Sequence, residues 1–202
     1  MKRLLFSVVM VCVGCESGAS RAASKAPGTA GTTATTKLPV DADQSASLSD
    51  AEVKHQVSTY LRSIDTAIPA ESWQSLGPRG AAQLLAVVGD AKAMPTTRSH
   101  AIDGLAMMGW KAAVPAVTAV AFAETEHVSV RFSAVRALGG LSSDEAALTS
   151  LLTSAGDARV RAAAGEVLAK REHGCDAVAR QAASEKDEAR EMFTRALKHC
   201  AK

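Results

Sequence analysis

The chain has 202 residues, of which 47% are hydrophobic, 22% are charged and 3% are aromatic. It carries 23 Lys and Arg against 21 Asp and Glu, with no cluster of basic residues interleaved with aromatic ones. This composition argues against nucleic acid as a partner and allows one domain with a substantial core.

The N-terminus has the pattern of an export signal. Met1-Lys2-Arg3 supplies positive charge, and the apolar run Leu4–Val13 is too short to span a bilayer as a mature helix. Removal of residues 1–14 would leave 21 basic residues against 21 acidic ones. The formal charge of the remaining chain would then be close to zero.

The sequence Val11-Cys12-Val13-Gly14-Cys15 resembles the lipobox of bacterial lipoproteins, in which a small residue precedes a cysteine that becomes acylated. The resemblance implies a lipid anchor at Cys15 and a place in the bacterial cell envelope. Glu16, where an aspartate would signal retention at the inner membrane, favours the outer membrane, facing the periplasm or the exterior. Cys12 departs from the pattern, since this position usually holds an aliphatic residue. The alternative is ordinary cleavage near Ala22 and release as a soluble protein.

Residues 15–46 are expected to form an acylated, disordered tether. From Glu16 onward they consist mainly of Ser, Thr, Ala, Gly and Pro, with almost no large apolar side chain to bury. A flexible chain of this length spans roughly 30 Å on average. The tether therefore lets a domain formed by residues 47–202 stand clear of a membrane surface.

That domain is predicted to be entirely helical. Ser49 and Glu52 form a Ser-x-x-Glu capping box that starts a helix running to about Thr66, and the stretch from Pro69 to Pro78 interrupts the pattern. The remaining helix candidates show 3.6-residue periodicity, short separators and no persuasive strand pattern. They cover residues 80–88, 97–108, 112–123, 128–141, 144–153, 158–171, 175–184 and 187–199.

An internal repeat organises these helices. An arginine is followed seven residues later by a leucine in four places, at spacings of 33, 30 and 29 residues. These pairs are Arg98 and Leu105, Arg131 and Leu138, Arg161 and Leu168, and Arg190 and Leu197. The repeat predicts a short right-handed α-solenoid of antiparallel helix pairs.

The run Val130–Gly139 resembles the HEAT-like repeats also found in phycobilin lyases, whose first helix often contains Val-Arg-x-x-Ala-x-x-Ala-Leu-Gly. Weaker copies surround Arg98 and Arg161, and the resemblance extends over residues 77–200. It implies a HEAT/armadillo-like fold. Phe193 replaces the small residue of the other copies, so we expect no neighbouring helix to pack there.

The four repeated arginines, Arg98, Arg131, Arg161 and Arg190, are expected to form a structural ladder. Glu126, Asp157 and Asp187 are the acidic residues best placed to pair with them. Ligand binding by the arginines is the alternative.

Cys175 and Cys200 lie at similar distances from the hinge between the last two helix candidates. Folding one helix against the other would bring the two cysteines level, and the oxidising envelope favours a disulfide between them. His173 and His199 lie beside the same cysteines, so a zinc site is the alternative.

No catalytic constellation is evident. The chain has no His-Glu pair of the kind used by iron-dependent hydroxylases built from similar repeats, and no Gly-rich phosphate loop. We therefore expect no enzyme activity, no cofactor, no metal and no small-molecule substrate.

The resulting hypothesis is a lipid-anchored, noncatalytic scaffold that binds another protein of the cell envelope. Gln83, Thr118 and Thr149, on the second helix of each pair, are candidate partner contacts, together with Trp110. Burial against an adjoining turn is the alternative for Trp110. A lyase or a metal-dependent enzyme on the same fold is the alternative function.

Overall fold

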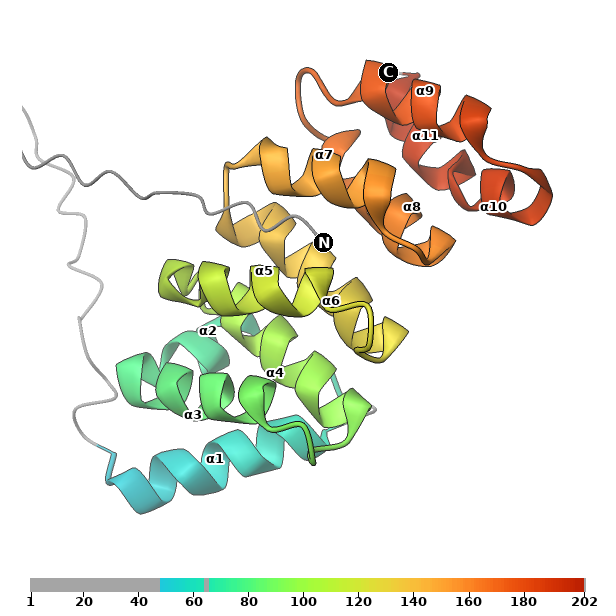
Figure 1. Cartoon of the computed structure of the whole chain (residues 1–202). Helices are drawn as coiled ribbons and strands as arrows, with labels where there is room; N and C mark the ends of the chain where they lie inside the picture. Colours follow the sequence, from blue (N-terminus) through green and yellow to red (C-terminus); the bar gives the residue numbers. More distant parts are fainter. Residues whose placement is uncertain (1–47, 64–65, 202) are drawn as a thin grey trace, which may run out of the picture. The chain divides into compact units, whose positions relative to one another are not determined.

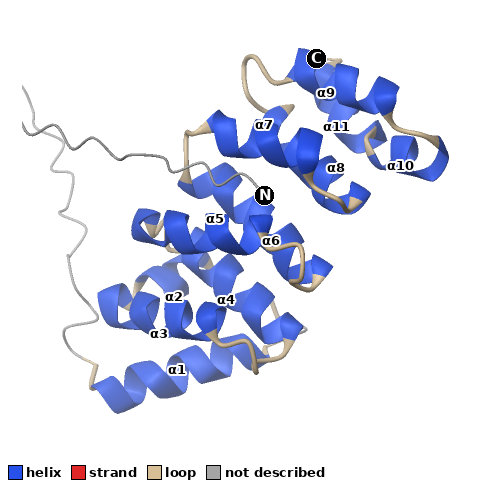
Figure 2. Cartoon of the chain, viewed as in Figure 1, coloured by secondary structure: helices blue, strands red, loops and turns tan. Residues whose placement is uncertain are grey.

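The computed structural model describes residues 48–63 and 66–201, so the predicted signal, Cys15 and the tether lie outside the described residues. Within the described ranges the secondary structure is helical throughout, as Figure 2 shows. The helices are α1 (Asp50–Arg62), α2 (Ala70–Gln74), α3 (Gly77–Gly89), α4 (Pro95–Met107), the 3-10 helix η2 (Lys111–Ala113), α5 (Val114–Phe122), α6 (Val128–Leu141), α7 (Glu145–Ser154), α8 (Ala158–Leu168), α9 (Cys175–Ser184), α10 (Asp187–Met192) and α11 (Thr194–Cys200). None of these helices is long and apolar enough to cross a bilayer.

Local signals in the sequence explain most helix boundaries. The predicted capping box starts α1, because the Ser49 hydroxyl accepts a hydrogen bond from the Glu52 N–H while the Glu52 carboxylate accepts one from the Ser49 N–H. Asp144 and Asp157 likewise accept hydrogen bonds from the first turns of α7 and α8. The predicted capping box at Ser49 and Glu52 is confirmed.

One helix was missed. The stretch Pro69–Pro78 was predicted to interrupt the helical pattern, but it contains the five-residue helix α2. A helix this short spans too few turns for its apolar period to be recognised. Its Trp73 is buried and packs edge to face against Tyr60 of α1, with ring centroids 5.1 Å apart. The segment therefore closes the N-terminal end of the core.

The helices form antiparallel pairs that stack one on another (Figure 1). The pairs are α3 with α4, α5 with α6, and α7 with α8, followed by α9 with α11. The predicted all-α solenoid is confirmed. The pairing is shifted by one helix from the expected one, because each arginine-bearing helix packs against the helix before it. Gln83, Thr118 and Thr149 therefore lie on the first helix of each pair.

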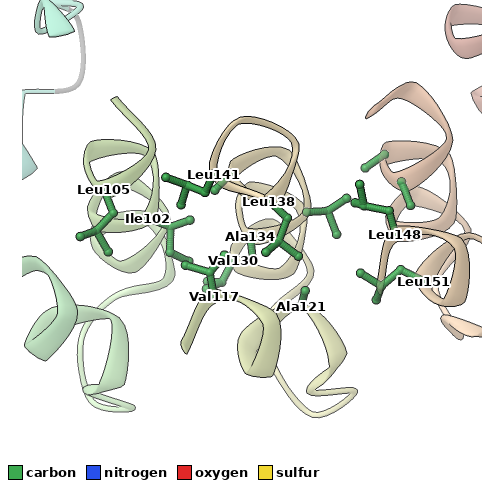
Figure 3. Close-up of a cluster of buried hydrophobic side chains, with 14 of the residues drawn as sticks. Ile102, Leu105, Val117, Ala121, Val130, Ala134, Leu138, Leu141, Leu148 and Leu151 are labelled. Atoms are coloured by element: carbon green, nitrogen blue, oxygen red, sulfur yellow. The ribbon is translucent and has the colours of Figure 1, made fainter. Parts of the chain in front are cut away.

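The pairs create two helix layers. We call α4, α6, α8 and α10–α11 the arginine layer, and α3, α5 and α7 the neutral layer. Neighbouring helices of the arginine layer pack along much of their length, whereas those of the neutral layer contact one another only sparsely. The core lies between the layers, as Figure 3 shows for buried side chains from α4, α5, α6 and α7. The labelled residues are Ile102, Leu105, Val117, Ala121, Val130, Ala134, Leu138, Leu141, Leu148 and Leu151.

Glycines allow close packing of α4 against α2 and of α6 against α8. A Cβ atom at Gly104 would lie 2.9–3.1 Å from the ring of Trp73, and one at Gly139 would lie 2.8 Å from a methyl group of Val167. Both separations are shorter than an ordinary contact between carbon atoms. Glycine at these positions leaves the space that the large side chain of the neighbouring helix fills.

The expectation for Phe193 is wrong. We expected no helix to pack at this position, but its side chain is fully buried. A Cβ atom at Gly165 of α8 would lie 3.2 Å from the Phe193 ring, so this ring fills the space over the glycine. Phe193 therefore faces inward and completes the core. Its position in the repeat alone could not indicate this burial.

Candidate interaction surface

The ladder arginines first act as caps on the preceding helices. Each guanidinium donates hydrogen bonds to backbone carbonyl groups at the C-terminal end of the helix before it, where such groups have no intrahelical partner. The shortest of these bonds join Arg98 to Val88 at 2.9 Å, Arg131 to Ala121 at 3.1 Å, Arg161 to Ala155 at 2.7 Å and Arg190 to Glu185 at 3.1 Å. The positive charge also complements the negative end of the helix dipole.

Three of the arginines also pair with carboxylates. Arg98 contacts Glu126 at 2.6 Å, and both side chains are largely buried. Arg131 binds both carboxylate oxygens of Glu124 at 2.8 Å. Arg161 binds both oxygens of Glu185, at 2.6 and 2.7 Å. The two bidentate pairs fix the planes of the groups as well as their charge.

These acids lie in the loops that connect the paired helices, so they link one repeat to the next. Glu126 follows α5 and reaches back to Arg98 of the preceding pair. Glu124 lies in the same loop and accepts a hydrogen bond from the N–H of Gly156, in the loop between α7 and α8. Arg161 donates to the carbonyl of Gly156 and continues the network to Glu185. The ladder runs along one edge of the stack.

Two of the three acids that we expected on the ladder are elsewhere. Asp157 caps α8 and pairs with Arg159, at 2.7 Å, because its position at the N-cap directs it toward its own helix. Asp187 begins α10 with a positive φ of 44° and takes no part in the network. Glu124 and Glu185 replace them. Glu185 directly follows α9 and Glu124 lies two residues beyond the end of α5, and no local pattern separates them from the other acids of the same loops.

The ladder shifts the ionisation of two of its acids. Hydrogen bonds from Arg131, and then from the Gly156 N–H, hold the pKa of Glu124 below its usual value. Those from Arg161, and then from Gln181, do the same for Glu185, whose side chain is only 8% exposed. The guanidinium groups are thus engaged by carboxylates and carbonyls within the fold. This engagement favours the structural role over the ligand-binding alternative.

The C-terminal hairpin contains a covalent bond. Cys175 at the start of α9 and Cys200 at the end of α11 form a disulfide, with Cα atoms 5.5 Å apart. The bond joins the two helices of the last pair, and neither sulfur is a free thiolate that could bind zinc. Across the described ranges, no group of three or more His, Cys, Asp or Glu side chains is arranged to hold a metal ion.

The neutral layer presents a surface without charge, which we call the neutral face. After the first turns of α3 and α7, and throughout α5, these helices contain no Asp, Glu, Lys or Arg, although 22% of the chain is charged. Its exposed or half-buried residues include Gln83, Thr118 and Thr149. Phe122, 39% exposed, adds a large apolar side chain at the end of α5. Three of the four candidate partner contacts therefore belong to one surface.

Trp110 belongs to another part of the molecule. It lies in the turn between α4 and η2, half-buried against the core, and its backbone N–H bonds to the Leu105 carbonyl at 3.1 Å. Packing against an adjoining turn was the alternative reading for this residue. The structure thus separates Trp110 from the three residues of the neutral face.

The solvent side of the arginine layer is different, because it carries charges of both signs. Arg136 lies on α6, Arg159 and Glu166 lie on α8, and Lys170 follows the end of α8. Burial raises the pKa of Asp103 on α4, although the nearby charges of Arg136 and His100 oppose the shift. This surface has the mixed charge that keeps protein surfaces soluble.

A groove between α1 and α3 lies next to the neutral face. It has a volume of about 490 Å³ and contains the side chains of Val57, Leu61, Gln83 and Val87. Its other lining residues are Lys54, Ser58 and Arg62 of α1, Ala86 of α3 and Thr97 of α4.

The comparisons with known proteins agree with this architecture. Residues 81–169 match the family model of HEAT repeats, and the match begins within α3 and ends just after α8. No curated protein and no solved structure matches the chain. The paired helices and the matched segment together show a HEAT-like helical repeat fold.

Proposed function

We propose that the protein is a lipid-anchored, noncatalytic scaffold that binds another protein of the bacterial cell envelope through its neutral face. The observation that carries this proposal is the uncharged surface over α3, α5 and α7. Interface cores are depleted in charged residues, as this surface is. HEAT-like repeats are commonly used as interaction scaffolds, which supports the same reading.

The anchor belongs to the proposal as well. Acylation of Cys15 would hold the chain at a membrane, in our proposal the outer membrane, and residues 16–46 would give the repeat domain freedom to reach its partner. Mass spectrometry of the intact protein from its own envelope tests this step. Acyl chains on an N-terminal Cys15 support the anchor, and an unacylated chain that begins near Ala22 contradicts it.

The binding step is tested by placing charge on the neutral face. We expect Ala119→Arg and Thr149→Arg to abolish co-purification with the envelope partner, because a charge would have to be buried without a counterion. The matched control is Lys170→Glu on the opposite layer, which should leave the complex intact. Thermal unfolding of each variant shows that the fold is retained. If Lys170→Glu disrupts the complex and the two neutral-face variants do not, the assignment of the surface is wrong.

A further inference from the structure

The groove between α1 and α3 has a defined direction. Arg79 near the start of α3 pairs with Asp50 at 2.9 Å and donates to the Leu48 carbonyl at 2.6 Å, so the N-terminal ends of the two helices lie together. Farther along, Leu61 and Arg62 of α1 line the groove with Ala86 and Val87 of α3. The two helices therefore run parallel, and Figure 1 shows them side by side at one end of the stack.

The floor of the groove is apolar. Val57 and Leu61 are 4% and 7% exposed, and Val87 is half-buried. Val57 and Leu61 are four residues apart on α1, as Gln83 and Val87 are on α3, so each pair faces the groove from one side of its helix. A groove between two parallel helices matches the surface of a third helix.

The rim of the groove is basic. Lys54 and Arg62 are the first and last of the α1 residues that line the groove, and none of the lining residues is acidic. The acids of α1 are engaged elsewhere, Asp50 with Arg79 and Glu52 in the capping box. Across the described part of the chain, neither Lys54 nor Arg62 has a carboxylate within ion-pair distance. At 1.5 Å per residue, their Cα atoms are about 12 Å apart along the helix.

We propose that this groove binds an acidic amphipathic helix of the partner protein. Apolar side chains at positions i and i+3 or i+4 fill the hollow, and carboxylates seven or eight residues apart meet Lys54 and Arg62. Gln83 and Val87 belong to α3, so a helix in this groove is continuous with a partner that covers the neutral face. The inference rests on the proposed scaffold function and names the chemistry of its partner.

The charge pattern of the groove defines the probe. We would use a fluorescent 18-residue peptide helix with leucines at i, i+3, i+4 and i+7 and two glutamates seven residues apart, and a second peptide with lysines in place of the glutamates. The full chain is reconstituted in lipid nanodiscs, and binding to empty nanodiscs is subtracted. Because two ion pairs at a solvent-exposed rim are involved, the glutamate peptide should bind about tenfold more tightly at low salt.

Two variants test the site itself. Lys54→Glu combined with Arg62→Glu should invert the preference, so that the lysine peptide binds better. The matched control, Lys186→Glu combined with Lys198→Glu, makes the same change of charge at the other end of the chain and should leave both affinities unchanged. Ser58→Trp fills the groove without changing charge and should weaken both peptides.

Equal binding of the two peptides, or an affinity that ignores all three changes in the groove, overturns the inference. Self-association of the chain that Ser58→Trp prevents also overturns it, because the occupant would then be a second copy. In each case, co-purification of the neutral-face variants with the envelope partner is a separate measurement. Failure of the peptide alone therefore leaves the scaffold function standing.

Discussion

The two helix layers differ in what holds them and in what they leave exposed. In the arginine layer, glycines admit neighbouring side chains and buried arginines join successive repeats. In the neutral layer, neighbouring helices touch sparsely and show solvent an uncharged surface. The difference indicates that the arginine layer fixes the geometry of the stack, whereas the neutral layer leaves a surface available to a partner.

The largest expected effect is from Arg161→Met in the arginine layer. This change leaves the Glu185 carboxylate buried without its partner, so we expect a loss of roughly 3–5 kcal/mol in the free energy of unfolding, measured with urea. Arg131→Met should cost less, because its partner Glu124 is 57% exposed and can be solvated. Equal losses for the two variants would show that carbonyl capping, rather than the buried acid, dominates.

Removal of the disulfide tests how much the bond between α9 and α11 stabilises the C-terminal end of the stack. The double variant Cys175→Ser, Cys200→Ser should lose roughly 2–4 kcal/mol, because the bond restricts the unfolded chain. Hydrogen exchange should accelerate first in α9 and α11 and last in α4 and α6. Reduction of the unmodified protein should reproduce the effect, and uniform acceleration along the stack would contradict a local role.

A larger side chain should destabilise the two layers to different extents. Gly104→Leu forces a side chain into the ring of the buried Trp73 and should cost roughly 1–3 kcal/mol, as overpacking does. Ala119→Leu, on the exposed surface of α5, should change stability by less than about 0.5 kcal/mol. Thermal unfolding of the two variants provides the measurement. Similar values would remove the distinction between the layers.

The smallest effect is expected from Asp103→Asn. Burial raises the pKa of this carboxyl in the folded state, so the charged form destabilises the fold as pH rises above the ordinary aspartate pKa of about 3.9. The variant should therefore be more stable than the original by up to about 1 kcal/mol at pH 7 and no more stable near pH 3. Urea unfolding at the two pH values checks the sign. A gain that persists at pH 3 would mean that charge is not its cause.

The sequence predicted the repeat because its signal is local. Arg131 and Leu138 lie two helical turns apart on one face, and the spacing of the copies identifies stacked helices without any knowledge of their contacts. The capping box at Ser49 is equally local, since both partners lie within four residues. Cys175 and Cys200 required one further step, a hinge between two helices.

The features that sequence analysis missed depend on contacts between repeats. Glu185 meets Arg161 across 24 residues of chain, and nothing in the composition of its loop distinguishes it from Asp187 two positions later. Phe193 is buried only because Gly165 on another helix leaves room for its ring. The groove above Val57 exists only through the relative placement of α1 and α3. Such features follow from three-dimensional register rather than from periodicity.

The loop between α5 and α6 holds two acids that serve different arginines: Glu124 binds Arg131, which follows it, and Glu126 binds Arg98 of the previous pair. This loop therefore takes part in two ion pairs, one within its own helix pair and one with the previous helix pair. Deletion of one internal helix pair would leave a guanidinium without its carboxylate on one side of the junction and a carboxylate without its guanidinium on the other, unless the new junction had the same residue spacing. Adjacent repeats should accordingly unfold together. Repeats can be added or removed only if each arginine at the new junction keeps a carboxylate partner.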